Sequence, residues 1–117
     1  MLKVLLAEDD ATMVNLLKTL LKMEGYQVTA LDSEANIAMS AIDAKPDVLL
    51  MDVHLLHHNG IEELKKLRAT PGGEAIHVLM TSGLDFKDKC LANGANGFIQ
   101  KPFMPDDLLN ALKKAAR

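Results

Sequence analysis

The hydrophobic positions of this chain fall into five short runs, separated by segments in which apolar residues recur with helical spacing. The runs at 4–7, 48–51 and 76–80 are almost continuously apolar, which is typical of strands buried on both faces of a sheet. The run at 27–31 alternates polar and apolar residues, and the run at 98–100 is short. We therefore expect three central strands and two edge strands.

The segments between these runs carry residues that begin and end helices. Asp, Ser and Asn side chains can accept hydrogen bonds from the first N–H groups of a helix, and Gly tolerates the positive φ that often follows the last turn. Leu108, Leu112 and Ala115 have the spacing of core-facing residues in the last helix. The first two predicted helices lie between Asp10 and Gly25 and from a Ser33 cap to about Ala44. The third begins at an Asn59 cap, with Glu62 as its capping-box partner, and ends at the loop at 70–73. The fourth covers 85–93, and the fifth begins at Pro105.

Alternation of five strands with five helices predicts a single α/β domain over residues 1–117. Right-handed crossovers between parallel strands place helices on both faces of the sheet. With the three apolar runs in the middle, the strand order becomes 2-1-3-4-5, the flavodoxin-like (βα)5 doubly wound parallel sheet. Ligands of such sheets bind beyond the carboxyl ends of the strands where the order reverses, here between the first and third strands.

Composition narrows the class of protein further. The net charge is −3 and no basic face is dense enough to predict direct nucleic-acid binding. The single Cys90 excludes an internal disulfide and fits a reducing compartment, and we interpret it as a small apolar residue on a helix. No segment approaches the roughly 20 apolar residues of a membrane span. We expect a cytoplasmic protein without membrane contact, either a stand-alone domain or a piece of a longer chain.

Acidic side chains gather at the predicted switch point of the sheet. Glu8, Asp9 and Asp10 follow the first strand, and Asp52 ends the third. Two like charges ~4 Å apart repel by about 4 kcal/mol at an effective dielectric of about 20, so such a cluster needs a proton or a cation. Clustered carboxylates with a carbonyl and waters suit Mg²⁺. We interpret Asp9 and Asp52 as a metal-binding pair and Asp10 as a helix cap.

Two further strand ends lie on the same edge as these acids. Residues 81–83, Thr-Ser-Gly, end the fourth strand, and Lys101 with Pro102 follows the fifth. A hydroxyl and an ammonium that face carboxylates and a metal make a site for a phosphoryl group. Mg²⁺ and Lys101 would neutralise its charge, Thr81 would donate to one of its oxygens, and Asp52 would act as the nucleophile.

These motifs resemble the receiver domains of response regulators in two-component signal transduction, including chemotaxis regulators. The similarity covers residues 3 to about 116. The segments that carry it are LLAEDD at 5–10, LLMDVHL at 49–55, NG at 59–60, VLMTSG at 78–83 and GANGFIQKPF at 94–103.

The resemblance implies a phosphorylation chemistry for the acids. Asp52 would accept a phosphoryl group from a sensor histidine kinase or a phosphotransfer protein. Asp9 and Asp52 would ligate Mg²⁺ together with the backbone carbonyl of His54, and Glu8 would hold the metal through water. The protein would then be a regulatory phosphoprotein rather than an enzyme, because it would catalyse only its own phosphoryl transfer and autodephosphorylation.

The resemblance also implies a conformational switch. Thr81 and Lys101 would contact the phosphoryl oxygens, and Phe98 lies where the family places an aromatic side chain that turns inward as the threonine moves. The bond between Lys101 and Pro102 would be the family's cis peptide. An unknown protein target would read the face formed by the fourth helix, fifth strand and fifth helix, and a phosphorylation-dependent homodimer is a further expectation.

Three histidines follow Asp52 in sequence. His54, His57 and His58 have no spacing fixed by a helix or hairpin, so we interpret them as loop residues rather than as a transition-metal site. His54 lies two residues after Asp52, as Gly83 does after Thr81. In the family these two positions flank the phosphoryl group and tune its lifetime, and we hypothesise that His54 does so here.

The sequence departs from the usual family pattern at a few positions. Leu56 stands where the family usually has proline, and Asn59 where it usually has aspartate, so we expect a less rigid loop after Asp52. Phe98 lacks the hydroxyl of the commoner tyrosine.

Three rival functions share parts of this pattern. A Mg²⁺-dependent phosphatase with an aspartyl-phosphate intermediate would usually carry a second acid at the position of His54, and would need a cap domain. A degenerate receiver would bind partners without phosphorylation, although all the key side chains are present. A flavodoxin would require a Ser/Thr/Gly-rich loop where this chain is acidic.

Overall fold

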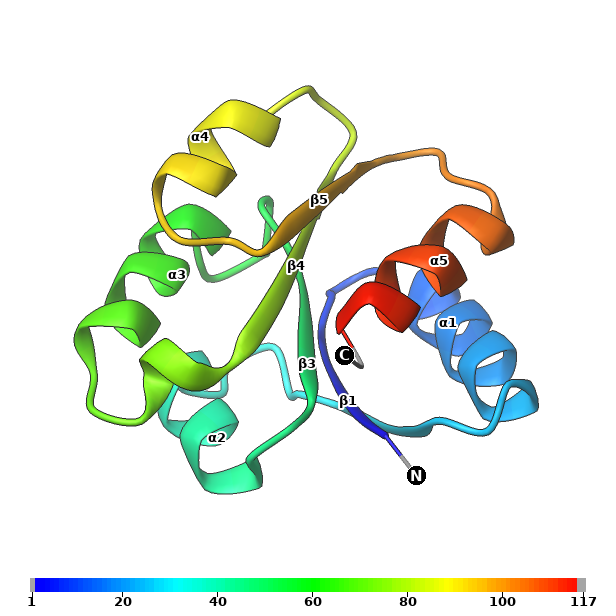
Figure 1. Cartoon of the computed structure of the whole chain (residues 1–117), viewed down its shortest axis with the longest axis horizontal. Coiled ribbons are helices and arrows are strands. Elements are labelled where there is room, and N and C mark those ends of the chain that lie inside the picture. Colours follow the sequence, from blue (N-terminus) through cyan, green and yellow to red (C-terminus); the bar gives the residue numbers. More distant parts are fainter. Residues whose placement is uncertain (1, 116–117) are drawn as a thin grey trace.

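A computed structural model of the chain describes residues 2–115, so the predicted domain limits at 1 and 117 lie outside the described residues. Strands and helices alternate along this part of the chain as expected (Figure 1). The strands are β1 (Lys3–Ala7), β2 (Gln27–Ala30), β3 (Val48–Asp52), β4 (His77–Ser82) and β5 (Gly97–Gln100). The helices are α1 (Ala11–Met23), α2 (Ile37–Ala44), α3 (Gly60–Ala69), the 3-10 helix η1 (Gly73–Ala75), α4 (Lys87–Ala92) and α5 (Pro105–Ala115).

All strand pairs are parallel, and the sheet has the order β2-β1-β3-β4-β5, which confirms the predicted topology. Helices α1 and α5 cover one face, while α2, α3 and α4 cover the other (Figure 1). Both faces of the central strands are therefore buried, which explains why their sequences are continuously apolar rather than alternating. Strand β2 lies at an edge, and its residues alternate between exposed and partly buried.

The core consists of two apolar layers separated by the sheet. Side chains from alternate positions of β1 and β3 enter opposite layers, so that Leu5 and Leu49 join one layer while Leu6 and Leu50 join the other. The second layer receives α1 and α5, including the predicted inward residues of α5. Cys90 is fully buried against the first layer, in agreement with its interpretation as an apolar helix residue.

Two of the three predicted N-cap residues, Asp10 and Asn59, are confirmed. Asp10 accepts hydrogen bonds from the N–H groups of Thr12 (2.9 Å) and Met13 (3.2 Å) at the start of α1. Asn59 accepts from the first N–H groups of α3. Glu62 pairs with Lys65 at 3.2 Å rather than turning back to close the predicted capping box.

The predicted Ser33 cap is wrong. Helix α2 begins at Ile37 with Asn36 as its cap, and the Asn36 side chain accepts from the N–H of Met39 at 3.1 Å. Before it, Asp32 accepts from the N–H of Glu34 at 2.9 Å, which folds the chain into a turn of its own. This local turn delays the helix by one turn. Helix α4 is also shorter than the predicted 85–93 and begins without a side-chain cap.

Gly60 fixes how closely the start of α3 approaches the end of β3. A Cβ atom at this position would lie 2.3 Å from the Asp52 carbonyl oxygen and 2.8 Å from the Val53 Cα. The Gly60 N–H donates to the Val53 carbonyl oxygen at 2.7 Å, so neither backbone segment can move away without losing this bond.

We expect Gly60→Ala to lower the free energy of unfolding by about 1–3 kcal/mol or more, because the clash involves two backbone segments. Urea denaturation checks this value, with Gly83→Ala as the control, since a Cβ at Gly83 meets nothing within 4 Å. Equal stability of the two variants would show that α3 and β3 are packed less closely than the structure shows.

Candidate functional site

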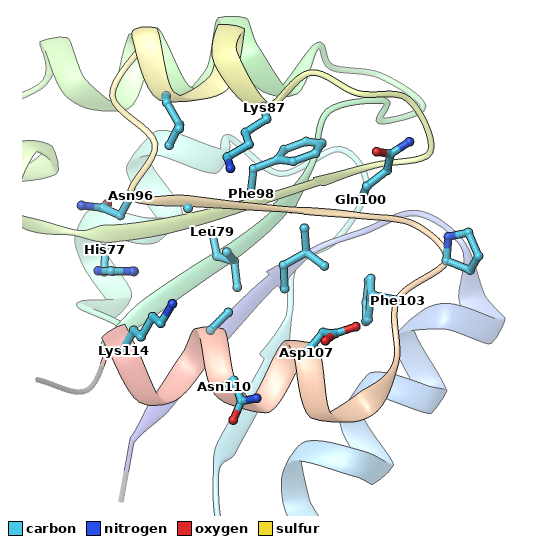
Figure 2. A pocket seen from close by; sticks show the side chains of 15 residues that line it. His77, Leu79, Lys87, Asn96, Phe98, Gln100, Phe103, Asp107, Asn110 and Lys114 are labelled. Atoms are coloured by element: carbon cyan, nitrogen blue, oxygen red, sulfur yellow. The ribbon is translucent and has the colours of Figure 1, made fainter.

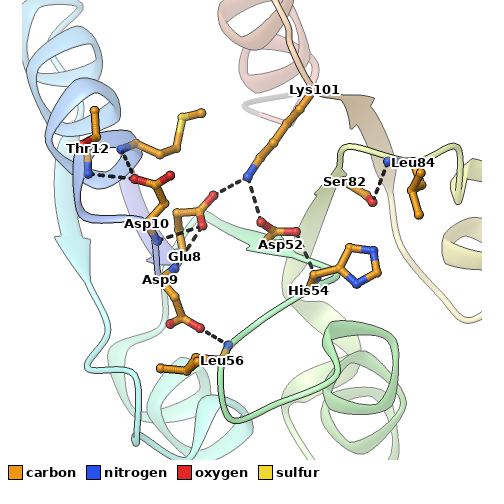
Figure 3. A network of polar contacts seen from close by, with 11 residues as sticks. Glu8, Asp9, Asp10, Thr12, Asp52, His54, Leu56, Ser82, Leu84 and Lys101 are labelled. Carbon is orange, nitrogen blue, oxygen red and sulfur yellow. Dashed lines mark hydrogen bonds and ion pairs between the residues drawn. The ribbon is translucent and has the colours of Figure 1, made fainter.

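The predicted acids and Lys101 lie together at the carboxyl ends of the strands (Figure 3). Asp52 ends β3 beside Thr81 of β4, and the N–H of Val53 donates to the Thr81 carbonyl oxygen at 2.8 Å. Lys101 follows β5, and its N–H donates to the Ser82 carbonyl oxygen at 2.8 Å. The peptide bond between Lys101 and Pro102 is cis, as expected.

Lys101 joins two of the acids. Its Nζ lies 2.6 Å from Glu8 Oε1 and 2.7 Å from Asp52 Oδ2 (Figure 3). The side chains of Glu8 and Asp52 are only 8% and 10% exposed. Two carboxylates this poorly hydrated would repel each other strongly, and the shared ammonium removes that cost. The ion pair is therefore the electrostatic centre of the site.

The pKa of Lys101 lies above its ordinary value of 10.5. Burial alone would lower this pKa, but the hydrogen bonds and negative charges of Asp52 and Glu8 together outweigh burial. Lys101 is therefore charged at neutral pH, as neutralisation of the acids requires.

The carboxylate of Asp52 is held at both oxygens. Its Oδ2 accepts from Lys101, and its Oδ1 accepts from the N–H of His54 at 3.0 Å. The backbone after β3 thus orients the acid as well as supporting it. Thr81 is buried, and together with Glu8, Asp52 and Lys101 it lines a void of about 10 Å³, close to the space that one water requires.

The three consecutive acids after β1 have different partners. Glu8 turns inward, where its Oε2 accepts from the N–H groups of Asp9 (3.0 Å) and Asp10 (3.2 Å). Asp10 caps α1, as predicted. Asp9 turns toward the segment 53–59, the β3–α3 loop, where its Oδ2 accepts from the N–H of Leu56 (Figure 3). This last bond was not predicted; the only related signal in the sequence is that residue 56 is not proline and so has an N–H.

The donor set at this edge fits Mg²⁺ in type. Glu8, Asp9 and Asp52 offer hard carboxylate oxygens, and three negative charges face one ammonium. Within residues 2–115, no group of three or more His, Cys, Asp or Glu side chains is already arranged around a metal position. Lys101 lies between Glu8 and Asp52, and Asp9 faces the loop, so metal binding requires these side chains to reorient.

Phe98 lies away from the acids. It lines a groove of about 630 Å³ between α4 and α5, the α4–α5 groove, whose floor is β5 (Figure 2). Lys87 and Gln100 line the same groove. The face that the sequence analysis predicts as the output surface is concave, and β4 separates it from Asp52.

The three histidines do not converge. His54 is exposed and stacks edge-to-face on Phe86, with ring centroids 5.4 Å apart. His57 is exposed, while His58 places Nδ1 3.7 Å from the buried carboxylate of Glu63. The ring of Phe86 was not predicted from the sequence, since it precedes α4 without any motif.

The fold and the site together define an α/β domain with a carboxylate–lysine centre at the carboxyl edge of a parallel sheet. The sequence model of the response regulator receiver domain matches residues 4–113, and the chain belongs to this family. Aspartate phosphorylation is general in receiver domains, which accept phosphoryl groups from histidine kinases and act as regulatory switches.

Curated relatives include the transcriptional regulatory protein CpxR of Escherichia coli, which is 37% identical over 118 residues, and the DNA-binding response regulator MtrA of Mycobacterium tuberculosis, which is 32% identical. Each alignment covers 98% of this chain but only 49% of CpxR and 50% of MtrA. The chain thus spans about half the length of these relatives.

Solved structures of receiver domains have a similar fold. The receiver domain of a sensor histidine kinase from Pseudomonas aeruginosa, with a magnesium ion in its active site cleft, has a TM-score of 0.86 and 26% identity, and the match covers 99% of this chain and 98% of that one. The chemotaxis response regulator CheY4 of Vibrio cholerae has a TM-score of 0.87 and 28% identity, with 98% of each chain covered. In the part of the chain that the structure describes, no helix is long and apolar enough to cross a membrane.

The raised pKa of Lys101 gives a testable contribution to stability. Because folding favours the protonated form, this contribution is complete below the ordinary pKa of 10.5 and is lost as the pH rises through the raised value. We expect Lys101→Gln to cost about 2 kcal/mol of unfolding free energy at neutral pH, since it leaves two buried carboxylates unpaired.

Urea denaturation between neutral pH and about pH 11 measures the difference between wild type and variant, which should shrink toward the alkaline end. Lys113→Gln removes the same charge from an exposed position of α5 and is the control. A loss no larger than that of the control would contradict the central position of Lys101.

Proposed function

We propose that this chain accepts a phosphoryl group on Asp52 in a Mg²⁺-dependent reaction and then presents an altered surface to a partner protein. The observation that carries the proposal is the convergence of Asp52, Thr81 and Lys101 on one small void. The donor would be a phosphohistidine of a sensor histidine kinase or a phosphotransfer protein, which is the general donor for this family.

Asp52, Lys101 and Thr81 have different roles in the proposed phosphoryl transfer. An oxygen of Asp52 forms the new P–O bond as the P–N bond of the donor breaks. Lys101 neutralises charge on the phosphoryl oxygens, and the Thr81 hydroxyl donates to one of them. These steps use groups that lie together before any ligand arrives.

The metal site would consist of Asp9, Asp52 and the backbone carbonyl of His54, with Glu8 holding the metal through water. When bound, Mg²⁺ supplies positive charge that offsets the acids and the incoming phosphoryl group. The magnesium ion in the cleft of the similar receiver domain supports this assignment.

The output would be a protein contact. Movement of the Thr81 hydroxyl toward the phosphoryl group would free space for Phe98 to turn inward and so reshape the α4–α5 groove, which is the expected face for a protein target or for a phosphorylation-dependent homodimer. Helix α4 has six residues and no side-chain cap, so it is well suited to shift. We further propose a cytoplasmic location and no direct nucleic-acid contact by residues of this domain.

Intact-mass spectrometry after incubation with acetyl phosphate tests the proposal. We expect one phosphoryl adduct on the wild type with Mg²⁺, and none without the metal or on Asp52→Asn. Asp43→Asn, which changes an exposed acid of α2, should still form the adduct. Failure of the wild type to accept phosphoryl groups from acetyl phosphate and from a phosphohistidine donor would favour a degenerate receiver. Turnover of a free phosphomonoester would favour the phosphatase.

The lifetime of the phosphorylated form should depend on His54. Its exposed ring lies two residues after Asp52 and packs edge-to-face on Phe86, so it would shield the acyl phosphate from water, while Gly83 has no side chain to do so. We expect His54→Ala to shorten the half-life about threefold, and Phe86→Ala to shorten it less. The decay of the adduct measures this, with the exposed His57→Ala as control, and equal half-lives for all variants would contradict it.

A further inference from the structure

Asp9 is the one acid of the metal-binding set that Lys101 does not contact. Glu8 and Asp52 share the ammonium, whereas Asp9 Oδ2 accepts a hydrogen bond from the backbone N–H of Leu56 (Figure 3). A hydrogen bond from an amide to a carboxylate is charge-assisted and stronger than a neutral one. The carboxylate is therefore held against the β3–α3 loop.

The loop backbone, and not the Leu56 side chain, sets the position of this N–H. The Val53 N–H donates to the Thr81 carbonyl oxygen, and the Gly60 N–H donates to the Val53 carbonyl oxygen at 2.7 Å. Within the loop, the N–H of Leu55 donates to the carbonyl oxygen of His58 at 3.2 Å. Leu56 is 74% exposed. The contact to Asp9 therefore requires the backbone N–H of residue 56 and not the leucine side chain.

An N–H at position 56 is present with any residue except proline, which has no N–H to donate. Leu56 does not have a left-handed backbone conformation, so a proline at this position is compatible with the sign of its φ. The hydrogen bond to Asp9 therefore depends on a residue other than proline at position 56.

We propose that the Leu56 N–H competes with the divalent cation for the carboxylate of Asp9, and so lowers the affinity of this chain for Mg²⁺. The inference rests on the proposed metal site. In this proposal, the cation draws the Asp9 carboxylate away from the loop, and the loss of its charge-assisted hydrogen bond weakens cation binding. The carbonyl of His54, the backbone ligand of that site, lies two residues before Leu56 in the same loop. Metal binding and release of the loop are therefore a single coupled event.

Isothermal titration with MgCl₂ on the full chain tests the competition. We expect Leu56→Pro to bind Mg²⁺ on the order of tenfold more tightly than the wild type. Leu56→Ala keeps the N–H and removes the exposed side chain, so it should bind like the wild type. Replacement of the Leu56 amide by an ester, with the leucine side chain retained, removes the N–H without restricting φ and should reproduce the gain of the proline variant.

The outcomes separate the two proposals. If Asp9→Asn abolishes Mg²⁺ binding but the proline and ester variants bind no more tightly than Leu56→Ala, the competition is wrong and the metal site stands. If Mg²⁺ binding to the wild type is absent or independent of Asp9, both are wrong. The amide resonance of Leu56 gives a second readout, since it should shift on Mg²⁺ saturation and in Asp9→Asn; an unchanged resonance in both would also overturn the competition.

Discussion

The carboxyl edge of the sheet depends on the balance between three carboxylates and one ammonium. Glu8 and Asp52 are buried within 2.7 Å of the same Lys101 nitrogen, and Asp9 lies beside them on the loop after β1. Without that nitrogen, neighbouring carboxylates would repel by about 4 kcal/mol at ~4 Å and an effective dielectric of about 20. Three carboxylates and one ammonium leave two net negative charges, which one Mg²⁺ ion would neutralise. The metal dependence of the proposed reaction follows from this same balance.

The strand order of the sheet allows Lys101 to reach these acids. In the order β2-β1-β3-β4-β5, Lys101 follows an edge strand, and its partner Asp52 lies at the end of β3 on the far side of β4. Only a long side chain reaches across that distance, and its apolar stem can lie along the strand ends while the ammonium meets the acids. Helices on both faces shield the central strands from water. The pairing of β3 with β4 places Asp52 beside Thr81.

Most of the architecture could be predicted from the sequence because hydrophobic periodicity reports which faces are buried. Continuous apolar runs and one alternating run were enough to order the strands, and Asp52, Thr81 and Lys101 then had to meet at one edge. The Ser33 cap failed because Asp32 forms a competing local turn, which depends on side-chain hydrogen bonds rather than on periodicity. The direction of the Asp9 carboxylate could not be predicted for a similar reason, since it depends on a loop N–H.

The most direct test of Asp52 as the phosphoryl acceptor is to identify the phosphorylated residue chemically. Borohydride reduces an aspartyl phosphate to homoserine, so treatment of the phosphorylated chain followed by peptide sequencing in a mass spectrometer locates the acyl phosphate. We expect homoserine at position 52 and a reduced product at no other acid, and only in samples phosphorylated in the presence of Mg²⁺. Homoserine at Asp9 or another aspartate, hydroxynorvaline at Glu8 or another glutamate, or the absence of any reduced residue from a sample that carries the phosphoryl adduct would contradict the assignment of Asp52 as the nucleophile.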